Sequence, residues 1–375
     1  MAKLGEVCEV LDSKRVPITA ANRVSGQYPY YGANGVQDYV ADYIFDDELV
    51  LLAEDGGNFG SKEKPIAYRV SGKCWVNNHA HVLKPKAVID VDYLCYSLMF
   101  YDVSGLVNGV TRQKLTQSDM RKMEIPLRTM VEQKNIVCRL NKLTELISLR
   151  KQQLAKLDEL VKARFVEMFG DSVANTKNFP STTLETVMTV FPQNGLYKPQ
   201  TDYVQDNTGI PILRIDAFYN GKVTNWNTLK RLICSETEIN RYLLRENDIV
   251  INRVNSIEYL GKCAHIVGLK EKTVFESNMM RFHMDEKKVN AVYVTEVLCT
   301  EDIYRQILRR AKKSVNQASI NQEDVKSLEI LVPPLSLQNQ FAAFVERVDQ
   351  QKQTVQQSLE KLELMKKALM QEYFG

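Results

Sequence analysis

The chain has 375 residues, with 49 lysines and arginines against 46 aspartates and glutamates, so its formal net charge is only +3. This length predicts about two or three domains, and the small net charge excludes a globally basic nucleic-acid-binding protein, so any such binding must come from local patches. Seven scattered cysteines without a C-x-x-C pair argue against a zinc or disulfide framework. No apolar run approaches about 18 residues and the first residues do not resemble a signal peptide, so we expect a soluble cytoplasmic protein.

Residues 1–128 predict a first mixed α/β domain. Short strand-like segments at 48–53, 66–70 and 79–83 are separated by turns rich in glycine and asparagine. The apolar segment 91–101 is typical of a buried helix.

Residues 129–170 predict one long helix. Thr129 and Glu132 form a capping-box pattern at its start, and Gly170 follows its end. Roughly 40 helical residues would make a rod of about 60 Å. Apolar residues recur in alternating steps of four and three, as in a heptad repeat, at Ile136, Leu140, Leu143, Ile147, Leu154, Leu157 and Val161.

Residues 171–333 predict a second α/β domain that opens with a polar linker. Its order of segments echoes the first domain, since 246–253 is similar to 47–52 and 291–300 is similar to 91–101. Residues 334–375 then predict a second long helix. Its heptad positions are Phe341, Val345, Val348, Val355, Leu359, Leu362 and Leu369.

The segment 115–170 occurs twice, because a shift of 205 positions aligns it without a gap on 320–375. A repeat of this size indicates two tandem halves, each with a domain followed by a helix. The heptad interruptions are complementary: Arg150 in the first copy corresponds to Val355 in the second. We therefore predict that the two helices pack on each other within one chain. The alternative is two amphipathic helices in separate cores.

Most catalytic patterns are missing from the sequence. It contains no P-loop and no Asn-Pro-Pro-Tyr or Asp-Pro-Pro-Tyr run, and the glycines at 56–60 lack the strand-turn-helix context of a dinucleotide site. His79 and His81 lie two residues apart, without a partner at metal-ligand spacing, so we predict ordinary strand histidines and no metal site.

One acidic pair remains as a candidate for catalysis. Glu54 and Asp55 lie near lysines and faintly resemble a nuclease cluster, but a solvated loop is the more common origin of such a pair. The matching region of the second half carries Arg253 and Asn255 instead. Loss of the acids from the repeat argues against catalysis shared by the two halves.

Polar and aromatic loop residues suited to nucleic acid occur in both halves. Arginine and lysine suit phosphate or guanine, and asparagine and glutamine suit adenine edges. Each residue alone is more often part of a solvated face or a core. The occurrence of two such sets on two related domains strengthens the prediction of nucleic-acid binding. The candidates are Tyr30, Tyr31, Asn34, Asn58, Lys62, Asn78, His79, His81, Thr111, Arg112, Gln113 and Lys114 in the first half, and Arg214, Lys222, Asn252, Arg253, Asn255, Ser256, Asn278, Lys312, Lys313, Asn316 and Gln317 in the second.

With these residues the whole chain resembles the DNA-specificity (S) subunits of type I restriction-modification systems. The most specific part is the segment 330–335 with Gln338, Gln340 and the helix that follows. The first copy departs from it, because 125–129 has one proline where the second copy has two. The other segments that carry the resemblance are 30–35, 38–40, 43–45, 54–56, 209–211, 248–250, 252–253 and 316–320.

The resemblance implies an α+β protein in which two α/β target-recognition domains are separated by two long helices. These helices would form an intrachain antiparallel coiled coil in a pseudo-twofold arrangement. Each domain would read half of a split, asymmetric target in double-stranded DNA. Two methyltransferase subunits would dock on the helices, and restriction subunits with translocase and endonuclease activity would join them.

The resemblance also implies that the chain has no catalytic activity and no cofactor of its own. S-adenosylmethionine and ATP with Mg would belong to the partner subunits. Two other classes of function remain open from the residues alone: a coiled-coil scaffold without DNA binding, and an unrecognised nuclease or methyltransferase.

Overall fold

The computed structural model describes residues 1–109, 113–206 and 208–375. The chain divides into two compact units: unit 1 combines Met1–Gln153 with Val355–Gly375, and unit 2 is Leu154–Thr354. Each unit therefore contains one α/β domain and parts of two 40-residue helices, α4 (Met130–Phe169) and α9 (Leu335–Phe374). Among the described residues, no helix is both long and apolar enough to cross a membrane.

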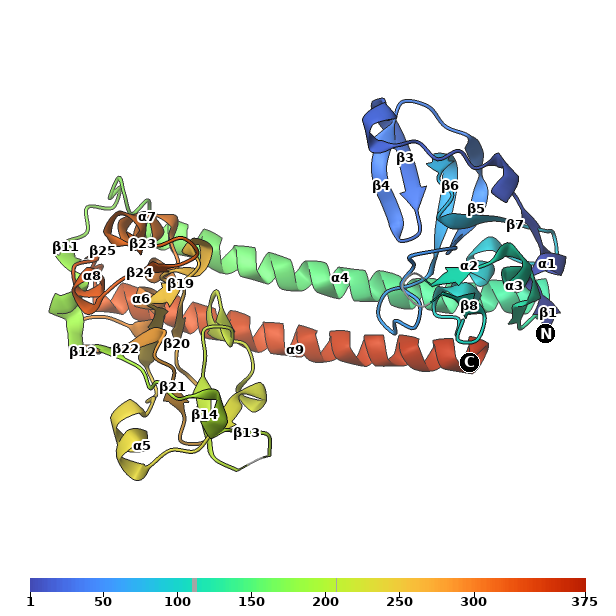
Figure 1. Cartoon of the computed structure of the whole chain (residues 1–375). Helices are drawn as coiled ribbons and strands as arrows, with labels where there is room; N and C mark the ends of the chain where they lie inside the picture. The colour runs from blue at the N-terminus through green and yellow to red at the C-terminus, as the bar shows by residue number, and fades with distance from the viewer. Residues whose placement is uncertain (110–112, 207) are drawn as a thin grey trace. The chain divides into compact units, whose positions relative to one another are not determined.

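The domain of unit 1 is built on a six-stranded sheet that is antiparallel except for the pair β3 and β6 (Figure 1). The segment 49–53 at its centre is fully buried, as expected for a short continuous apolar run. Helix α2 (Val91–Met99) packs on β5 and β6. In spatial order the strands are β2 (Cys8–Val10), β7 (Ala80–Pro85), β5 (Phe45–Ala53), β6 (Ala67–Val76), β3 (Ser25–Gly32) and β4 (Gly35–Val40).

The strands at 48–53, 66–70 and 79–83 and the helix at 91–101 are confirmed, with modest shifts of their ends. The shorter elements of unit 1 lie at the chain start and just before α4. They are β1 (Ala2–Lys3), α1 (Leu4–Val7), two 3-10 turns (Asp12–Lys14 and Ala20–Asn22), β8 (Val107–Asn108), β9 (Lys114–Leu115), α3 (Gln117–Lys122) and β10 (Glu124–Ile125).

The domain of unit 2 has a six-stranded sheet and a four-stranded sheet. The first has the order β12 (Met188–Asn194), β22 (Met279–Met284), β18 (Asp248–Asn252), β20 (Cys263–His265), β16 (Gly221–Val223) and β15 (Phe218–Tyr219). The second has the order β13 (Tyr203–Val204), β17 (Lys230–Leu232), β14 (Ile210–Leu213) and β21 (Val274–Phe275). Besides a small three-stranded sheet and several 3-10 turns, the unit has α5 (Glu236–Tyr242), α6 (Ala291–Leu298), α7 (Glu301–Arg310), α8 (Gln322–Lys326), and a pair formed by β11 (Ser181–Thr183) and β25 (Glu329–Leu331).

In unit 1 a buried glutamine and a tyrosine join the domain to the long helices. Gln133 on α4 is fully buried and accepts a hydrogen bond of 2.8 Å from the backbone N–H of Asp90, the N-cap of α2. The Tyr93 hydroxyl donates to the carbonyl of Pro126 at 2.9 Å, and its ring packs edge-on against Phe374 of α9. Each buried polar group thus has a partner, as a stable buried contact requires.

Unit 2 repeats these contacts with the matching residues of the second copy. Gln338 on α9 is fully buried and accepts from the backbone N–H of Asn290, the N-cap of α6, at 2.8 Å. The Tyr293 hydroxyl donates to the carbonyl of Leu331 at 2.9 Å, and its ring packs on Phe169 of α4 at 4.6 Å between centroids. The sequence repeat is therefore also a repeat of the contacts that hold each domain to its helices.

Within each unit the two long helices run antiparallel. In unit 1, Arg139 Nη1 donates to the Tyr373 hydroxyl at 3.1 Å, and Lys151 Nζ lies 2.9 Å from Glu363 Oε1. The partner's residue number falls as the residue number on α4 rises, which defines the direction. Thr129 and Glu132 form the predicted capping box at the start of α4.

In unit 2, Asp158 pairs with Lys352, and the Phe169 ring lies 5.5 Å from Phe341. The numbers again run in opposite directions.

The predicted heptad positions lie on the packed side of the long-helix segments in both units. Ile136, Leu140, Leu143, Leu157, Val161, Phe341, Val345, Val348, Val355 and Leu359 are buried, and Ile147, Leu154, Leu362 and Leu369 are half-buried.

Candidate nucleic-acid interface

In unit 2 the structure brings two predicted polar segments, far apart in sequence, into one small three-stranded sheet. β19 (Val254–Asn255) pairs with β24 (Ala318–Ser319), which pairs with β23 (Lys312–Lys313). The side chains of 312–317 are all exposed. We call residues 312–319 ribbon 2. Its connection from β23 to β24 carries the predicted DNA-contact residues Asn316 and Gln317.

Arg253 and Asn278 lie at the base of ribbon 2. The Arg253 N–H donates to the Asn278 carbonyl at 2.8 Å, and the Arg253 carbonyl accepts from the N–H of Ile320 at 2.9 Å. The guanidinium donates through Nη1 to the Ser277 carbonyl at 3.2 Å, while its buried Nε has no hydrogen-bond partner among the described residues. Arg253 is thus held by its backbone, with part of its donor capacity unused.

Unit 1 contains a similar but two-stranded arrangement, and we call its described residues, 107–109 and 113–115, ribbon 1. β8 pairs with β9, and the Leu115 N–H donates to the Glu54 carbonyl at 2.7 Å. The Glu54 N–H donates in turn to the His79 carbonyl at 2.9 Å. By these backbone bonds Glu54 occupies in unit 1 the position that Arg253 occupies in unit 2. Thr111 and Arg112, predicted to contact DNA, lie outside the described residues.

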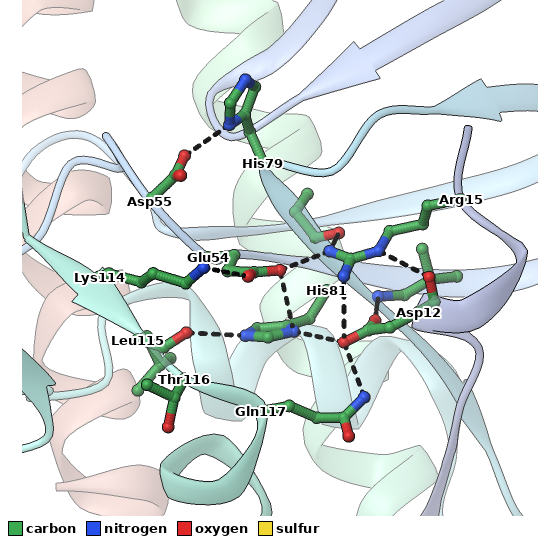
Figure 2. Close-up of polar contacts among 12 residues, drawn as sticks. Asp12, Arg15, Glu54, Asp55, His79, His81, Lys114, Leu115, Thr116 and Gln117 are labelled. Carbon is green, nitrogen blue, oxygen red and sulfur yellow. Dashed lines mark hydrogen bonds and ion pairs between the residues drawn. The ribbon is translucent and has the colours of Figure 1, made fainter. Parts of the chain in front are cut away.

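A cluster of charged side chains lies beneath ribbon 1 (Figure 2). His81 is fully buried, with Nδ1 at 2.7 Å from Asp12 Oδ2 and Nε2 at 3.0 Å from the Leu115 carbonyl. Arg15 Nη1 lies 2.5 Å from Glu54 Oε2, and Lys114 Nζ lies 3.0 Å from Glu54 Oε1. Because a carbonyl can only accept, Nε2 of His81 donates to Leu115. The cluster therefore joins the 3-10 turn Asp12–Lys14, the central sheet and ribbon 1.

The charges in this cluster offset one another. Burial disfavours the ionised form of Asp12, but the hydrogen bond and charge of His81, the Val82 N–H and the charge of Arg15 outweigh it and hold the pKa of Asp12 below its ordinary value. The ligand atoms of Asp12, Glu54 and His81 lie within 4.8 Å of one another, as metal ligands would. Arg15 and Lys114 already pair with these carboxylates, so the geometry favours a closed ion-pair cluster over a metal site.

Three of the predicted DNA-contact residues are wrong, because their side chains are in the core. Tyr30 is 1% exposed, and its hydroxyl bonds the backbone of Ile18. His81 and Asn252 are fully buried, the first in the cluster above and the second with its amide donating to the Tyr259 carbonyl. All three lie in strands of the main sheets. A strand places alternate side chains on opposite faces, and these face inward.

Lys222 is half-buried and its ammonium pairs with Asp349 of α9, which joins the domain of unit 2 to its helix, and its contact with DNA stays a prediction. Of the other predicted contacts, Asn34, Lys62, Asn78, Gln113 and Lys114 are exposed, as are the four in ribbon 2. Half-buried candidates are Tyr31, Asn58, His79, Arg214, Arg253, Asn255, Ser256 and Asn278. Their contact with DNA stays a prediction.

The sequence did not point to Asp12, Arg15 and Gln117 as members of the cluster under ribbon 1. Gln117 Nε2 donates to Asp12 Oδ2 at 3.0 Å, and Arg15 donates through Nη1 to the Ala80 carbonyl at 2.8 Å. No spacing rule links residues so far apart. The one available signal was Gln117 itself, which is repeated as Gln322 in the second copy.

Comparison with known proteins gives a consistent assignment. The family model of the type I restriction modification DNA specificity domain matches residues 1–159 and 179–364. The type I restriction enzyme EcoKI specificity subunit of Escherichia coli is 24% identical over 322 residues, covering 81% of this chain and 67% of that protein. A Haemophilus influenzae relative is 38% identical over 145 residues, 39% of this chain, and the match spans only 37% of that relative.

Solved structures agree with the fold. The S subunit of a type I restriction-modification system from M. genitalium superposes with a TM-score of 0.63 at 13% identity, covering 100% of this chain and 95% of that one. A chain from a structural study of complex assembly in the type I system gives a TM-score of 0.55 at 16% identity, covering 100% of this chain and 96% of that one. With a family model that matches both halves, the chain belongs to the type I restriction-modification DNA specificity family.

Proposed function

We propose that this chain is the DNA-reading subunit of a type I restriction-modification complex, and that each α/β domain reads one part of a bipartite, asymmetric target. The observation that carries the proposal is the repeated ribbon. Both units hold a short ribbon through the same backbone bonds, at Glu54 and at Arg253, yet Asn316 and Gln317 of ribbon 2 correspond in sequence to Thr111 and Arg112. The same backbone arrangement with different polar side chains suits two domains that recognise different bases.

The long helices supply the second part of the proposal. We propose that the antiparallel pairing within each unit belongs to one continuous intrachain coiled coil of α4 and α9 with pseudo-twofold symmetry. Such a spacer would fix the separation of two half-sites, about one helical turn of DNA apart. Two weak readers on a rigid spacer gain effective concentration only when both half-sites are correctly spaced.

Two equivalent docking sites for a partner are supported by exposed apolar residues on the helices. Leu160 of α4 and Met365 of α9 are 45% and 53% exposed and occupy the same position of the repeat. We propose that this apolar position, exposed in both copies, belongs to a binding surface used twice. We propose that two methyltransferase subunits dock there and that restriction subunits join them. Catalysis, S-adenosylmethionine and ATP with Mg would belong to those partners, in the cytoplasm.

Replacement of the docking residues tests this stoichiometry. Leu160→Asp or Met365→Asp should each remove one methyltransferase copy from the purified complex, and the double variant should remove both, because a charge would be buried without a partner. Mass photometry of the co-purified complex counts the copies. Val166→Asp is the control, since Val166 is 60% exposed but corresponds to Gln371 in the second copy. Two bound copies in the double variant would refute these docking sites.

Binding to DNA separates the proposal from a scaffold function. The full chain should bind random-sequence duplex, with an affinity that falls steeply as salt rises, because cations of the ribbons displace counterions from phosphates. Fluorescence anisotropy of labelled duplex during a salt titration measures this. A scaffold without a DNA site would show no binding at low salt, and a nuclease would shorten the duplex when Mg is added.

A further inference from the structure

Two cysteines of unit 2 lie with their sulfur atoms in contact. Cys263 Sγ is 3.6 Å from Cys299 Sγ, although the two residues are 36 positions apart in the chain. Cys263 Sγ also lies 3.9 Å from the Thr295 carbonyl, to which its S–H can donate. Both cysteines are free thiols. Since a disulfide needs about 2.05 Å between its sulfurs, the pair is reduced and already adjacent.

The two thiols differ in exposure and in freedom to move. Cys263 is 1% exposed and lies in β20, which pairs with β18 on one side and with β16 on the other. Cys299 is exposed and is the C-cap of α6. Gly221 of β16 presents no side chain to it, and a Cβ there would lie 3.6 Å from Cys299 Sγ. Cys299 is therefore the thiol that meets solvent, and Cys263 is a fixed partner behind it.

The surroundings of Cys263 keep its thiol protonated. The hydrogen bond with Cys299 is the main reason that the pKa of Cys263 is raised well above its ordinary value, and burial adds to it. The charge of Glu296 acts in the same direction on the pKa of Cys263. Because the thiolate is the reactive form, Cys263 is protected from an oxidant in solution, and the exposed Cys299 reacts first.

We propose that Cys299 and Cys263 form a site of reversible oxidation by hydrogen peroxide, with a disulfide between them as its product. The Cys299 thiolate attacks one peroxide oxygen, so that an S–O bond forms, the O–O bond breaks, and hydroxide leaves and takes up a proton to become water. Cys263 then displaces the hydroxyl of the sulfenic acid: the S–S bond forms, the S–O bond breaks, and the hydroxyl leaves as water with the Cys263 proton. The two sulfurs thereby give two electrons to the peroxide, and a dithiol returns them by thiol–disulfide exchange.

The disulfide would join the two chain segments that lead into the small sheet of ribbon 2. On one side β20 pairs with β18, and the chain continues from β18 into β19. On the other side Cys299 is followed by α7, and the chain continues from α7 into β23. A cross-link between residues so far apart restricts the unfolded chain, so we expect the oxidised unit 2 to unfold at a higher urea concentration.

Peptide mapping of the full chain tests the site. The chain is treated with hydrogen peroxide, its remaining thiols are blocked under denaturing conditions, and it is digested with trypsin without reductant. Cleavage after Lys270 and Lys288 places the two cysteines on separate peptides. We expect these peptides to be joined, lighter by two hydrogen atoms than the sum of the reduced pair, and separated by dithiothreitol. Two of the seven thiols of the chain should be lost to the blocking reagent.

Single variants separate the roles of the two thiols. In Cys263→Ser, Cys299 should stop at the sulfenic acid, which dimedone traps, and in Cys299→Ser the buried Cys263 should stay reduced. Cys138→Ser is the control, because Cys138 is also exposed but lies on α4, and it should form the joined peptides as the wild type does. Circular dichroism verifies that each variant is folded.

Urea unfolding followed by Trp226 fluorescence measures the effect of the bond on unit 2. The reference is the oxidised sample after dithiothreitol, which opens the disulfide but leaves any methionine sulfoxide in place. The oxidised chain should have the higher urea midpoint. The inference is overturned if Cys299 is oxidised beyond the sulfenic acid without joined peptides, if it stays reduced while Cys138 is oxidised, or if the two urea midpoints are equal.

Discussion

Phe341→Ala is expected to lower the free energy of unfolding of unit 2 by about 3–5 kcal/mol, the usual cost of removing a buried aromatic ring. Phe341 of α9 is fully buried. Its ring packs edge-on against Phe165 and Phe169 of α4, at 5.5 Å between centroids in both cases. Truncation would leave a cavity where the two long helices meet the domain of unit 2.

The chain offers a specific probe for this measurement, because its two tryptophans, Trp75 and Trp226, lie in different units. Urea unfolding followed by Trp226 fluorescence in a Trp75→Phe background reports on unit 2. Phe191→Ala is the control, since Phe191 is 54% exposed, and it should change stability by less than about 0.5 kcal/mol. Equal losses in the two variants would contradict the packing of α9 against α4 in unit 2.

His81→Leu is expected to lower the free energy of unfolding of unit 1 by about 3–5 kcal/mol, because it removes one partner of a buried charge pair and leaves the Asp12 carboxylate with fewer compensating contacts. The leucine would leave Asp12 without its 2.7 Å contact and the Leu115 carbonyl without its donor. A second substitution should restore part of the loss, since Asp12→Asn removes the charge that needed His81. Trp75 fluorescence in a Trp226→Phe background reports this double-mutant cycle.

The pH dependence of the same variants gives an independent readout. The pKa of Asp12 is lowered in the folded protein, so its contribution to stability is present above about pH 4, the ordinary range of aspartate, and is lost as pH falls through the folded pKa. In His81→Leu the folded pKa of Asp12 should rise, and unit 1 should lose less stability on acidification than the wild type. An acid-induced loss unchanged from the wild type would show that His81 does not stabilise the ionised form of Asp12.

The long helices could be predicted because their evidence is local and repeated. Heptad spacing identifies a packed face without knowledge of the partner, and the structure places those residues on the packed side. The central strand of unit 1 was recognisable for a similar reason, since 49–53 is a continuous apolar run. Gln133 and Gln338 are recognisable in the sequence only as a repeated pair. The structure adds that both side chains are buried and accept a hydrogen bond from the N-cap residue of a helix.

The candidate site was harder to predict, because its parts are joined by long-range pairing. Strands of two residues, such as β19 and β24, carry no periodic signal, so nothing in the sequence predicts that Asn255 lies beside Ala318. His79 and His81 lie on one face by alternation, yet only His81 is fully buried, because Asp12 and Glu54 surround it. Tyr30 and Asn252 were wrongly predicted to be exposed for contact with DNA, because which face of a strand is covered depends on the rest of the fold.

We propose that this chain gives a methyltransferase its DNA target. The most direct test is to co-express the full chain with the type I methyltransferase subunit of its own source, purify the complex, and map methylated adenines in the DNA of those cells. We expect two methyltransferase copies per chain and methylation at one split motif of fixed spacing. A chain that recruits no methyltransferase and leaves the DNA unmethylated would contradict it.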